Sequence, residues 1–208
     1  ITLPHAIAKR PIPFIYASTA AVYGDSDDLP YKELSRINPI SPYGIDKYSN
    51  ELHSAFANAH FGIPTCGFRF FNVFGPRQDP SSPYSGVISI FSQRCIDARP
   101  LHIFGDGTQE RDFIFVKDIV EFLLQAMNNP PSSHRVFNLC TGTTTTLLEL
   151  IDALSQVCNI APDIHFDSPR AGDIYRSQGD NSALLGHFGN YIFTDLSQGL
   201  RDFLNSLR

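Results

Sequence analysis

The sequence has 208 residues, of which 42% are hydrophobic and 18% charged, and its formal net charge is −5. This composition is ordinary for a globular protein of one domain or two small ones. The acidic balance argues against nucleic acid as a partner, and no apolar stretch approaches the roughly 20 residues that span a bilayer. We therefore expect no nucleic acid and no membrane among its partners.

The cysteines and histidines predict neither disulfides nor a metal site. Cys66, Cys95, Cys140 and Cys158 are far apart in the sequence and form no C-x-x-C pair, which favours a reduced, cytoplasmic protein. The seven histidines show no H-E-x-x-H or similar ligand spacing, so no metal is expected. The opening segment from Ile1 lacks the basic flank and apolar run of a secretory signal, so we expect an internal start or a truncation.

The first predicted elements are a strand, a helix and a second strand. An apolar run from Ile12 to Ala17 does not alternate, which suits a strand buried on both faces in a parallel sheet. Ser41-Pro42 predicts the start of a helix, and Gly62 with Pro64 predicts its end. A second buried strand over Thr65–Phe71 completes a unit that is typical of open α/β sheets.

After Asn72, clustered Gly, Pro and Ser residues predict a loop that leads to a second lobe. Further helices are expected over Val87–Ala98, Asp118–Asn128, Thr146–Cys158 and Thr194–Leu207. Short strands are expected over Leu101–Phe104, Phe113–Val116, Val136–Leu139 and Ile164–Phe166. The predicted fold class is therefore α/β.

Three side chains near these elements have the chemistry for proton transfer. Residues four apart share one face of a helix, so Tyr43 and Lys47 present a phenol and an ammonium side by side. The ammonium stabilises a phenolate, which can take a proton from a sugar hydroxyl beside a nicotinamide. Thr19 follows the first strand, where open α/β sheets bind ligands, and can relay the proton. A Y-x-x-x-K pair alone is common on surface helices, so the hypothesis depends on the surrounding motifs.

Longer motifs give the chain a resemblance to a known family. They are Ser18–Gly24, Tyr43–Lys47, Arg69–Arg77, Ile103–Gly107, Arg111–Phe113 and Pro169–Asp173. With them the sequence resembles the extended short-chain dehydrogenase/reductases, and within these the NAD-dependent epimerase/dehydratase family of nucleotide-sugar epimerases. It is similar to the C-terminal two-thirds of enzymes such as the UDP-glucose 4-epimerases.

The resemblance implies a particular organisation of the α/β fold. Residues 1–75 would be the C-terminal half of a Rossmann-like NAD-binding domain, rejoined by about 112–142, and residues 76–208 would form a smaller α/β lobe that binds the nucleotide sugar. The parallel sheet would be partial, with its first half missing. The glycine-rich turn that grips the NAD pyrophosphate precedes the matched region in the family, so we expect roughly a hundred residues to be absent.

The resemblance also implies roles for individual residues. The catalytic residues would be Thr19, Tyr43 and Lys47. The NAD contacts would be Ala17, Ser18, Tyr43, Lys47 and Phe71. The UDP-sugar contacts would be Asn72, Gly86, Val87, His102, Ile103, Phe104, Arg111, Arg170 and Asp173. Arginines suit a diphosphate, a carboxylate suits a ribose diol, and Phe104 suits a base.

Other interpretations of several residues remain open. Arg111 and Arg170 also suit surface ion pairs with a nearby Asp, while His102 and Val87 also suit ordinary packing. Related dehydratases place an acidic pair after the active-site Ser or Thr, where this chain has Ala20-Ala21, and this difference disfavours dehydration.

The activity implied by the resemblance is NAD-dependent 4-epimerisation of a UDP-hexose, by transient oxidation at C4 and return of the hydride, in a homodimer. Two alternatives remain. The chain is a truncated module that binds only the nucleotide sugar, or it belongs to an epimerase that acts on UDP-N-acetylhexosamines.

Overall fold

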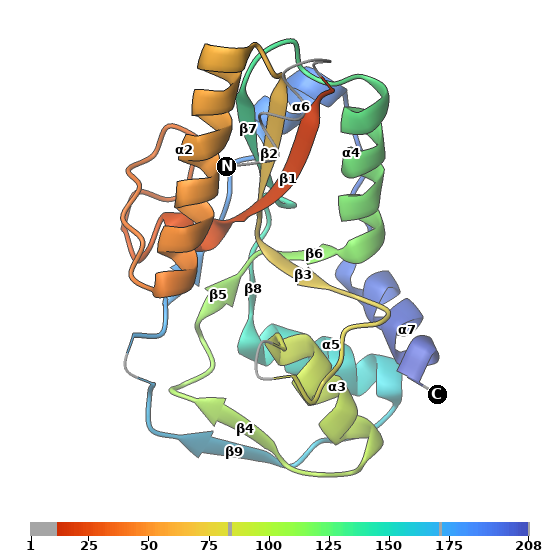
Figure 1. Cartoon of the computed structure of the whole chain (residues 1–208). Helices are drawn as coiled ribbons and strands as arrows, with labels where there is room; N and C mark the ends of the chain where they lie inside the picture. Colours follow the sequence, from red (N-terminus) through yellow and green to blue (C-terminus); the bar gives the residue numbers. More distant parts are fainter. Residues whose placement is uncertain (1–11, 83–84, 171, 208) are drawn as a thin grey trace.

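The computed structural model describes residues 12–82, 85–170 and 172–207. Of the residues named above, the first eleven of the predicted NAD-binding domain and Ala171 of the Pro169–Asp173 motif lie outside this description. The described chain forms an upper and a lower part in the view of Figure 1. No helix in the described ranges is both long and apolar enough to cross a membrane.

A parallel sheet of three strands forms the centre of the upper part (Figure 1). It consists of β1 (Phe14–Thr19), β2 (Thr65–Phe70) and β7 (Arg135–Leu139), in the order β1-β2-β7. Helix α2 (Pro42–Phe61) makes the crossover from β1 to β2 and packs against both strands. The register pairs Thr19 with Phe70 and Phe70 with Leu139, so the three carboxyl ends reach the same edge of the sheet. The predicted α/β class with a parallel sheet is confirmed.

The ends of α2 follow the predicted capping residues. The Ser41 side chain accepts a hydrogen bond from the Gly44 N–H at 3.1 Å, and Pro42 occupies the first turn, where its missing N–H costs nothing. The helix ends at Gly62, whose φ of +64° is the left-handed conformation that glycine adopts without strain. Both ends of the helix are therefore set by local sequence.

Strand β1 is shifted by two residues from the predicted range Ile12–Ala17. It begins at Phe14, whose N–H donates to the carbonyl of Pro64, because Pro13 has no N–H for the ladder. It ends at Thr19, because pairing with β2 continues through Ser18 and Thr19. The polar end of the strand is thus part of the sheet, whereas the predicted range stopped at Ala17.

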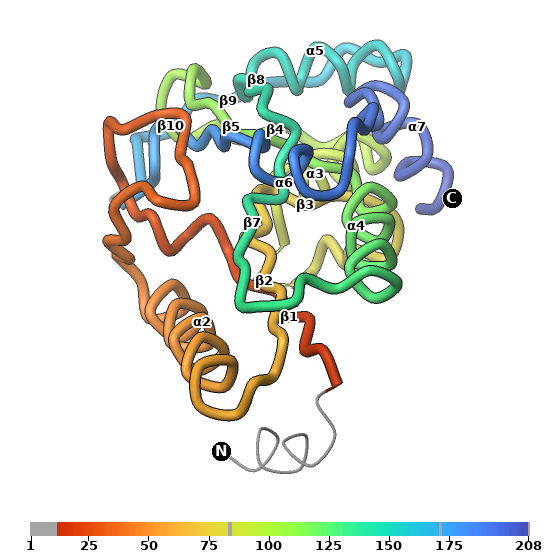
Figure 2. Tube along the Cα trace, turned by 90° about the horizontal axis from the view of Figure 1, so that it is seen from above, coloured from red at the N-terminus to blue at the C-terminus, as the bar shows by residue number. Residues whose placement is uncertain are grey.

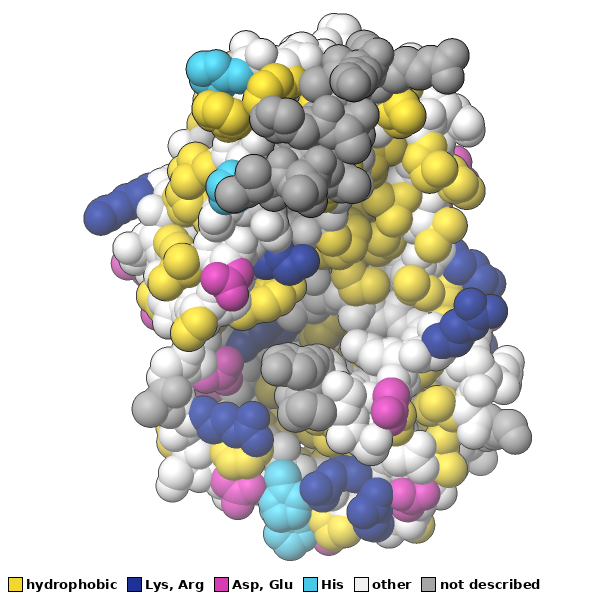
Figure 3. All heavy atoms as spheres, in the orientation of Figure 1, with side chains coloured by type: hydrophobic (Ala, Val, Ile, Leu, Met, Phe, Trp, Pro, Cys, Tyr) yellow, Lys and Arg dark blue, Asp and Glu magenta, His cyan; other side chains and the backbone are white. Residues whose placement is uncertain are grey.

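Different helices cover the two faces of this sheet. Figure 2 shows α2 on one side of β1 and β2 and α4 (Val116–Asn128) on the other, while α6 (Ser182–Phe188) packs against β7. Phe68 and Phe122 are fully buried in the core beneath α4. Leu124 and Met127 on the outer face of α4 are exposed, and Figure 3 shows apolar side chains spread over this side of the molecule.

The lower part packs three helices around a second core. They are α3 (Val87–Ile96), α5 (Leu147–Cys158) and α7 (Leu196–Leu207), with the parallel strand pair β4 (Leu101–Phe104) and β9 (Ile164–Asp167) beside them. A pair formed by β3 (Asn72–Phe74) and β6 (Phe113–Phe115) connects the two parts. A small sheet joins β10 (Arg176–Ser177), β5 (Glu110–Arg111) and β8 (Thr145–Thr146).

The predicted helices and strands are found with small shifts at their ends. α3 stops at Ile96, before the predicted Ala98, which has a φ of +50°. α5 begins after Thr146, because Thr146 and Glu149 form a reciprocal capping box. The strand predicted over Thr65–Phe71 is β2, which ends one residue earlier at Phe70. The chain turns at Phe71, and β3 then pairs with β6 outside the first sheet.

Candidate active site

A cavity of about 1100 Å³ lies where the two parts meet. Its wall includes residues from α2, β3, α3, β4 and the segment that follows β9. Of the predicted site residues, the wall contains Tyr43, Phe71, Asn72, Gly86, Val87, His102, Phe104, Arg111, Arg170 and Asp173. One continuous space therefore brings together groups spread over 130 residues of sequence, from Tyr43 to Asp173.

Tyr43 and Lys47 lie on one face of α2, as their spacing predicted. Tyr43 is the second residue of the helix, lines the cavity and is 54% exposed. The Nζ atom of Lys47 lies 5.8 Å from the centre of the Tyr43 ring and donates a hydrogen bond to the carbonyl of Ala17 at 3.2 Å. The ammonium thus connects the phenol-bearing turn of α2 to the end of β1.

Thr19 lies at the junction of β1 and a short 3-10 turn, η1 (Ala20–Val22). It is 8% exposed, and its Oγ1 accepts a hydrogen bond from the N–H of Ala21 at 3.2 Å. The first turn of α2 packs closely on η1, because a Cβ atom placed on Gly44 would lie 2.8 Å from the carbonyl oxygen of Ala21. The absence of a side chain at Gly44 therefore permits the approach of the Tyr43 turn to the Thr19 turn.

The hydroxyl of Ser18, a predicted NAD contact, is hydrogen-bonded to another side chain of the protein. The Ser18 Oγ donates to Oε1 of Glu51 at 2.5 Å. Glu51 is in turn held by Arg69 through two hydrogen bonds, of 3.0 Å from Nε and 2.7 Å from Nη2. The Glu51 and Arg69 side chains are only 5% and 6% exposed, so this is a buried ion pair beneath the carboxyl end of β1.

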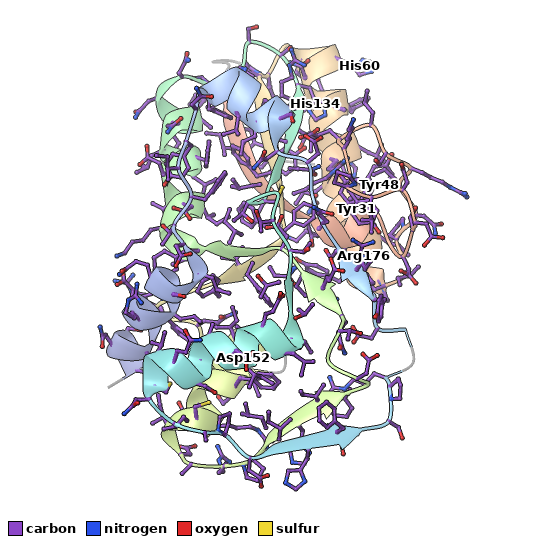
Figure 4. All side chains as sticks on the ribbon, turned by 180° about the vertical axis from the view of Figure 1, so that it is seen from behind. Tyr31, Tyr48, His60, His134, Asp152 and Arg176 are labelled. Atoms are coloured by element: carbon purple, nitrogen blue, oxygen red, sulfur yellow. The ribbon has the colours of Figure 1, made fainter. Side chains whose placement is uncertain are left out.

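The buried network continues away from β1. Arg69 donates from Nη1 to the hydroxyl of Tyr23 at 2.8 Å, and that hydroxyl donates to Oδ1 of Asn138 at 2.6 Å. Burial raises the pKa of Tyr23 to about 12, so this phenol stays protonated and neutral. Tyr31, which is labelled in Figure 4, stacks on Tyr23 with ring centres 4.6 Å apart. The sequence did not predict this network, because its members come from distant segments.

Phe71 and Asn72 form the cavity wall between the two parts. Phe71 is 7% exposed, and its N–H donates to the carbonyl of Leu139 at 3.2 Å. The backbone N–H and the side-chain amide of Asn72 both donate to the carbonyl of Asp112, at 3.0 and 3.2 Å. The connection from β2 to β3 therefore holds an aromatic ring and an amide at the cavity.

Asp112 is a fully buried carboxylate beside this wall. It accepts hydrogen bonds from the N–H and the hydroxyl of Thr141, at 2.9 and 2.8 Å, and from the N–H of Gly142 at 2.9 Å. Burial raises the pKa of Asp112 to about 6, although these three donors favour the ionised form. Its backbone N–H donates to the carbonyl of Ser177 at 3.0 Å.

The amino end of α3 and strand β4 supply another part of the wall. Gly86 is the N-cap of α3 and is followed by Val87, so backbone N–H groups without helical partners lie at the cavity. His102 shares a hydrogen bond of 2.9 Å between its Nδ1 and Oδ2 of Asp167. Ile103 differs from the prediction, because its side chain is completely buried in the lower core, whereas its neighbours on β4 line the cavity.

The two predicted arginines have different partners. Nη2 of Arg111 lies 2.8 Å from Oδ1 of Asp173, which is the ion pair that the alternative interpretation described. Burial lowers the pKa of Arg111, and Asp173 opposes that shift. The guanidinium of Arg170 instead lies over the ring of Phe104, 3.7 Å from its centre. Both arginines nevertheless line the same cavity.

Several wall residues were not predicted, among them Gln78, Arg94, Gln109 and Asp167. Gln109 lies between two quoted motifs, which is the one sequence signal that pointed to it. His134, labelled in Figure 4, shares a hydrogen bond of 2.7 Å with Thr65 at the amino end of β2, opposite the end that faces the cavity. Within the described ranges, no group of three or more His, Cys, Asp or Glu side chains is placed to hold a metal.

Comparison with known proteins identifies the family. The model of the NAD dependent epimerase/dehydratase family matches residues 1–140. The chain belongs to this family. Among epimerase/dehydratase relatives, a protein of Methanocaldococcus jannaschii is 39% identical over 195 residues, which are 93% of this chain and 62% of the relative. The UDP-glucose 4-epimerase of Mycolicibacterium smegmatis is 34% identical over 184 residues, or 88% of this chain and 58% of the relative.

Solved epimerase structures superpose closely on the chain. The UDP-N-acetylglucosamine 4-epimerase of Methanobrevibacter ruminantium, in complex with UDP-N-acetylmuramic acid, is 32% identical with a TM-score of 0.92. The match covers 99% of this chain and 66% of that one. The UDP-glucose 4-epimerase of Thermotoga maritima with UDP-glucose is 34% identical, with the same TM-score and coverage. The chain spans about 60% of the length of the curated epimerase/dehydratase relatives named above.

Proposed function

We propose that this chain carries the acid/base groups and the nucleotide-sugar site of an NAD-dependent UDP-hexose 4-epimerase. The observation that carries the proposal is the connection of Tyr43, which lines the cavity, through the Lys47 ammonium to the carbonyl of Ala17. The Tyr43 phenolate, stabilised by the ammonium, would take the proton from the C4 hydroxyl of the sugar, while the hydride on C4 would pass to NAD. Thr19 would hydrogen-bond the same hydroxyl.

The residues fit NAD on the nicotinamide side. Lys47 has three N–H donors and uses one on Ala17, which leaves donors for the hydroxyls of a ribose. Phe71 offers an apolar ring at the cavity. When bound, NAD supplies a reversible hydride acceptor. Ala17 and Ser18 would contribute through their backbone at the end of β1, since the Ser18 hydroxyl already donates to Glu51.

The opposite end of the cavity fits a nucleoside diphosphate. Arg111 and Arg170 would bind the diphosphate, aided by the backbone N–H groups that follow Gly86. The carboxylate of Asp173 would accept hydrogen bonds from the ribose hydroxyls, and the base would pack on Phe104. Asn72, Val87, His102 and the backbone of Ile103 would complete the wall.

Two further parts of the proposal concern the substrate and the assembly. Relatives named for UDP-glucose and for UDP-N-acetylglucosamine support both UDP-hexoses and UDP-N-acetylhexosamines as substrates. A homodimer through α2 is supported by the exposed Ile45, Leu52 and Phe56 on that helix. The cysteines of the described ranges form no disulfide, which suits a reducing cytoplasm.

Separate calorimetric titrations of the intact protein with UDP and with NAD, followed by a turnover assay on UDP-glucose and UDP-N-acetylglucosamine, test this proposal. An epimerase binds both ligands and interconverts the C4 epimers. Tyr43→Phe should keep UDP affinity within about twofold and lower turnover by roughly 100-fold or more. UDP binding without NAD binding would instead favour a non-catalytic nucleotide-sugar module, and normal turnover in Tyr43→Phe would refute the role of the phenol.

A further inference from the structure

Gln109 is a buried polar residue to which nothing above assigns a function. It is 6% exposed and lines both the main cavity and a neighbouring cavity of about 650 Å³. Phe104 and Arg170 line the same two cavities. Gln109 therefore lies in the wall that the two spaces share, next to the residues proposed to hold the base and the diphosphate.

The side-chain amide of Gln109 is bonded to the backbone of Phe104. Its Nε2 donates to the Phe104 carbonyl at 2.6 Å, just where β4 ends and Gly105 turns the chain with a φ of +90°. The backbone carbonyl of Gln109 accepts from the N–H of Leu147, the first residue of α5. One glutamine thus ties the end of β4 to the start of a packed helix.

The side-chain oxygen of the Gln109 amide is not used in the described part of the chain. The Oε1 atom of Gln109 is buried and has no hydrogen-bond partner there. Leaving such an acceptor unpaired destabilises the folded protein, and an apolar side chain of the same size would avoid this cost. A residue that only filled this space would not need the amide.

We infer that Gln109 is a positioning residue for the nucleotide, because it fixes the Phe104 backbone and so sets the ring on which a nucleobase packs. This inference rests on the proposed nucleotide-sugar function. Stacking of a base on an aromatic side chain is worth roughly 1–3 kcal/mol, so a displaced ring reduces affinity only for ligands that contain a base. Arg111, which is paired with Asp173 and does not pack on Phe104, would still attract a bare diphosphate.

The test compares UDP with inorganic pyrophosphate in calorimetric titrations of two variants. Gln109→Leu removes the donor, and Gln109→Glu keeps the shape but faces the Phe104 carbonyl with an oxygen. We expect both to weaken UDP about tenfold or more and pyrophosphate by less than twofold. Gln156→Leu, the same change on the exposed face of α5, should alter neither affinity.

Each result decides between the possibilities. Equal losses for UDP and pyrophosphate, or no loss for either, would overturn the positioning role. If Gln109→Leu fails to fold, the isosteric Gln109→Glu gives the same comparison, and misfolding of both variants would show a structural role instead. A native chain that does not bind UDP at all would refute the proposed nucleotide-sugar function, whereas normal UDP binding in the variants would refute only the role of Gln109.

Discussion

The ammonium of Lys47 donates a hydrogen bond of 3.2 Å to the carbonyl of Ala17, so one side chain links helix α2 to the carboxyl-terminal half of strand β1. The same ammonium lies 5.8 Å from the centre of the Tyr43 ring. Lys47 therefore has both a mechanical and an electrostatic connection to the proposed acid/base group, and its substitution separates binding from chemistry.

Lys47→Met should lower turnover on a UDP-hexose by roughly 100-fold or more, because the phenolate loses its neighbouring cation. UDP affinity should change less than threefold, since Lys47 is not among the residues at the nucleotide end of the cavity. Steady-state kinetics and calorimetry measure the two effects. Lys117→Met, which breaks the exposed pair with Asp202, is the matched control, and equal activity in both variants would contradict the role of Lys47.

Glu51→Gln should destabilise the protein by about 3–5 kcal/mol, because it leaves the buried guanidinium of Arg69 without its counter-charge. Urea unfolding measures the change. Asp97→Asn breaks the surface pair with Arg99, whose side chain is 58% exposed, and should cost less than about 1 kcal/mol. Similar losses of unfolding free energy in the two variants would show that the buried pair contributes no more to stability than the surface pair.

Asp112 should give the folding stability a distinct pH dependence. Its pKa is about 6 in the folded protein and 3.8 in the reference state, so between these values the folded protein binds more protons than the unfolded chain. The contribution of Asp112 is therefore complete below about pH 4 and is lost as the pH rises through about 6. The shift corresponds to at most about 3 kcal/mol.

Asp112→Asn isolates this term. The free energy of unfolding is measured for the native protein and for the variant at pH 4 and at pH 7. We expect the native protein to lose more stability between the two pH values than the variant does. A constant difference between native protein and variant across this range would show that the carboxylate does not titrate with a raised pKa.

Gly44→Ala should reduce turnover more than it reduces stability. The added Cβ would lie 2.8 Å from the Ala21 carbonyl, so the Tyr43 turn has to move away from the Thr19 turn. We expect at least a tenfold loss of turnover with little change in UDP affinity. Gly186→Ala in α6 meets no atom within 4 Å and should be neutral or slightly stabilising. Full activity of Gly44→Ala would show that the close approach is not needed.

The sequence predicted features that depend on neighbouring residues. The limits of α2 follow from Ser41, Pro42 and Gly62, whose capping and turn preferences act locally. Spacing alone likewise predicted that Tyr43 and Lys47 share a face. The strand at Leu101–Phe104 has the predicted limits. In each case the physical cause lies within a few residues of its effect.

Features that depend on long-range contacts were not predicted. The extension of β1 to Thr19 requires β2 as its partner, and the use of the Ser18 hydroxyl requires Glu51, 33 residues away. Ile103 was assigned to the site with its neighbours, but side chains alternate along a strand, so it points into the core while His102 and Phe104 face the cavity. Tertiary packing determines the end of β1, the partner of the Ser18 hydroxyl and the direction of the Ile103 side chain.

Three other segments of the chain are hydrogen-bonded to Asp112. Its backbone and carboxylate bind Asn72 at the start of β3, Thr141 and Gly142 after β7, and Ser177 in β10. The upper sheet and the lower wall of the cavity therefore share one anchoring residue. A ligand that displaces any of these segments has to strain or carry along the others, so the opposite sides of the cavity respond to occupancy as a single mechanical unit.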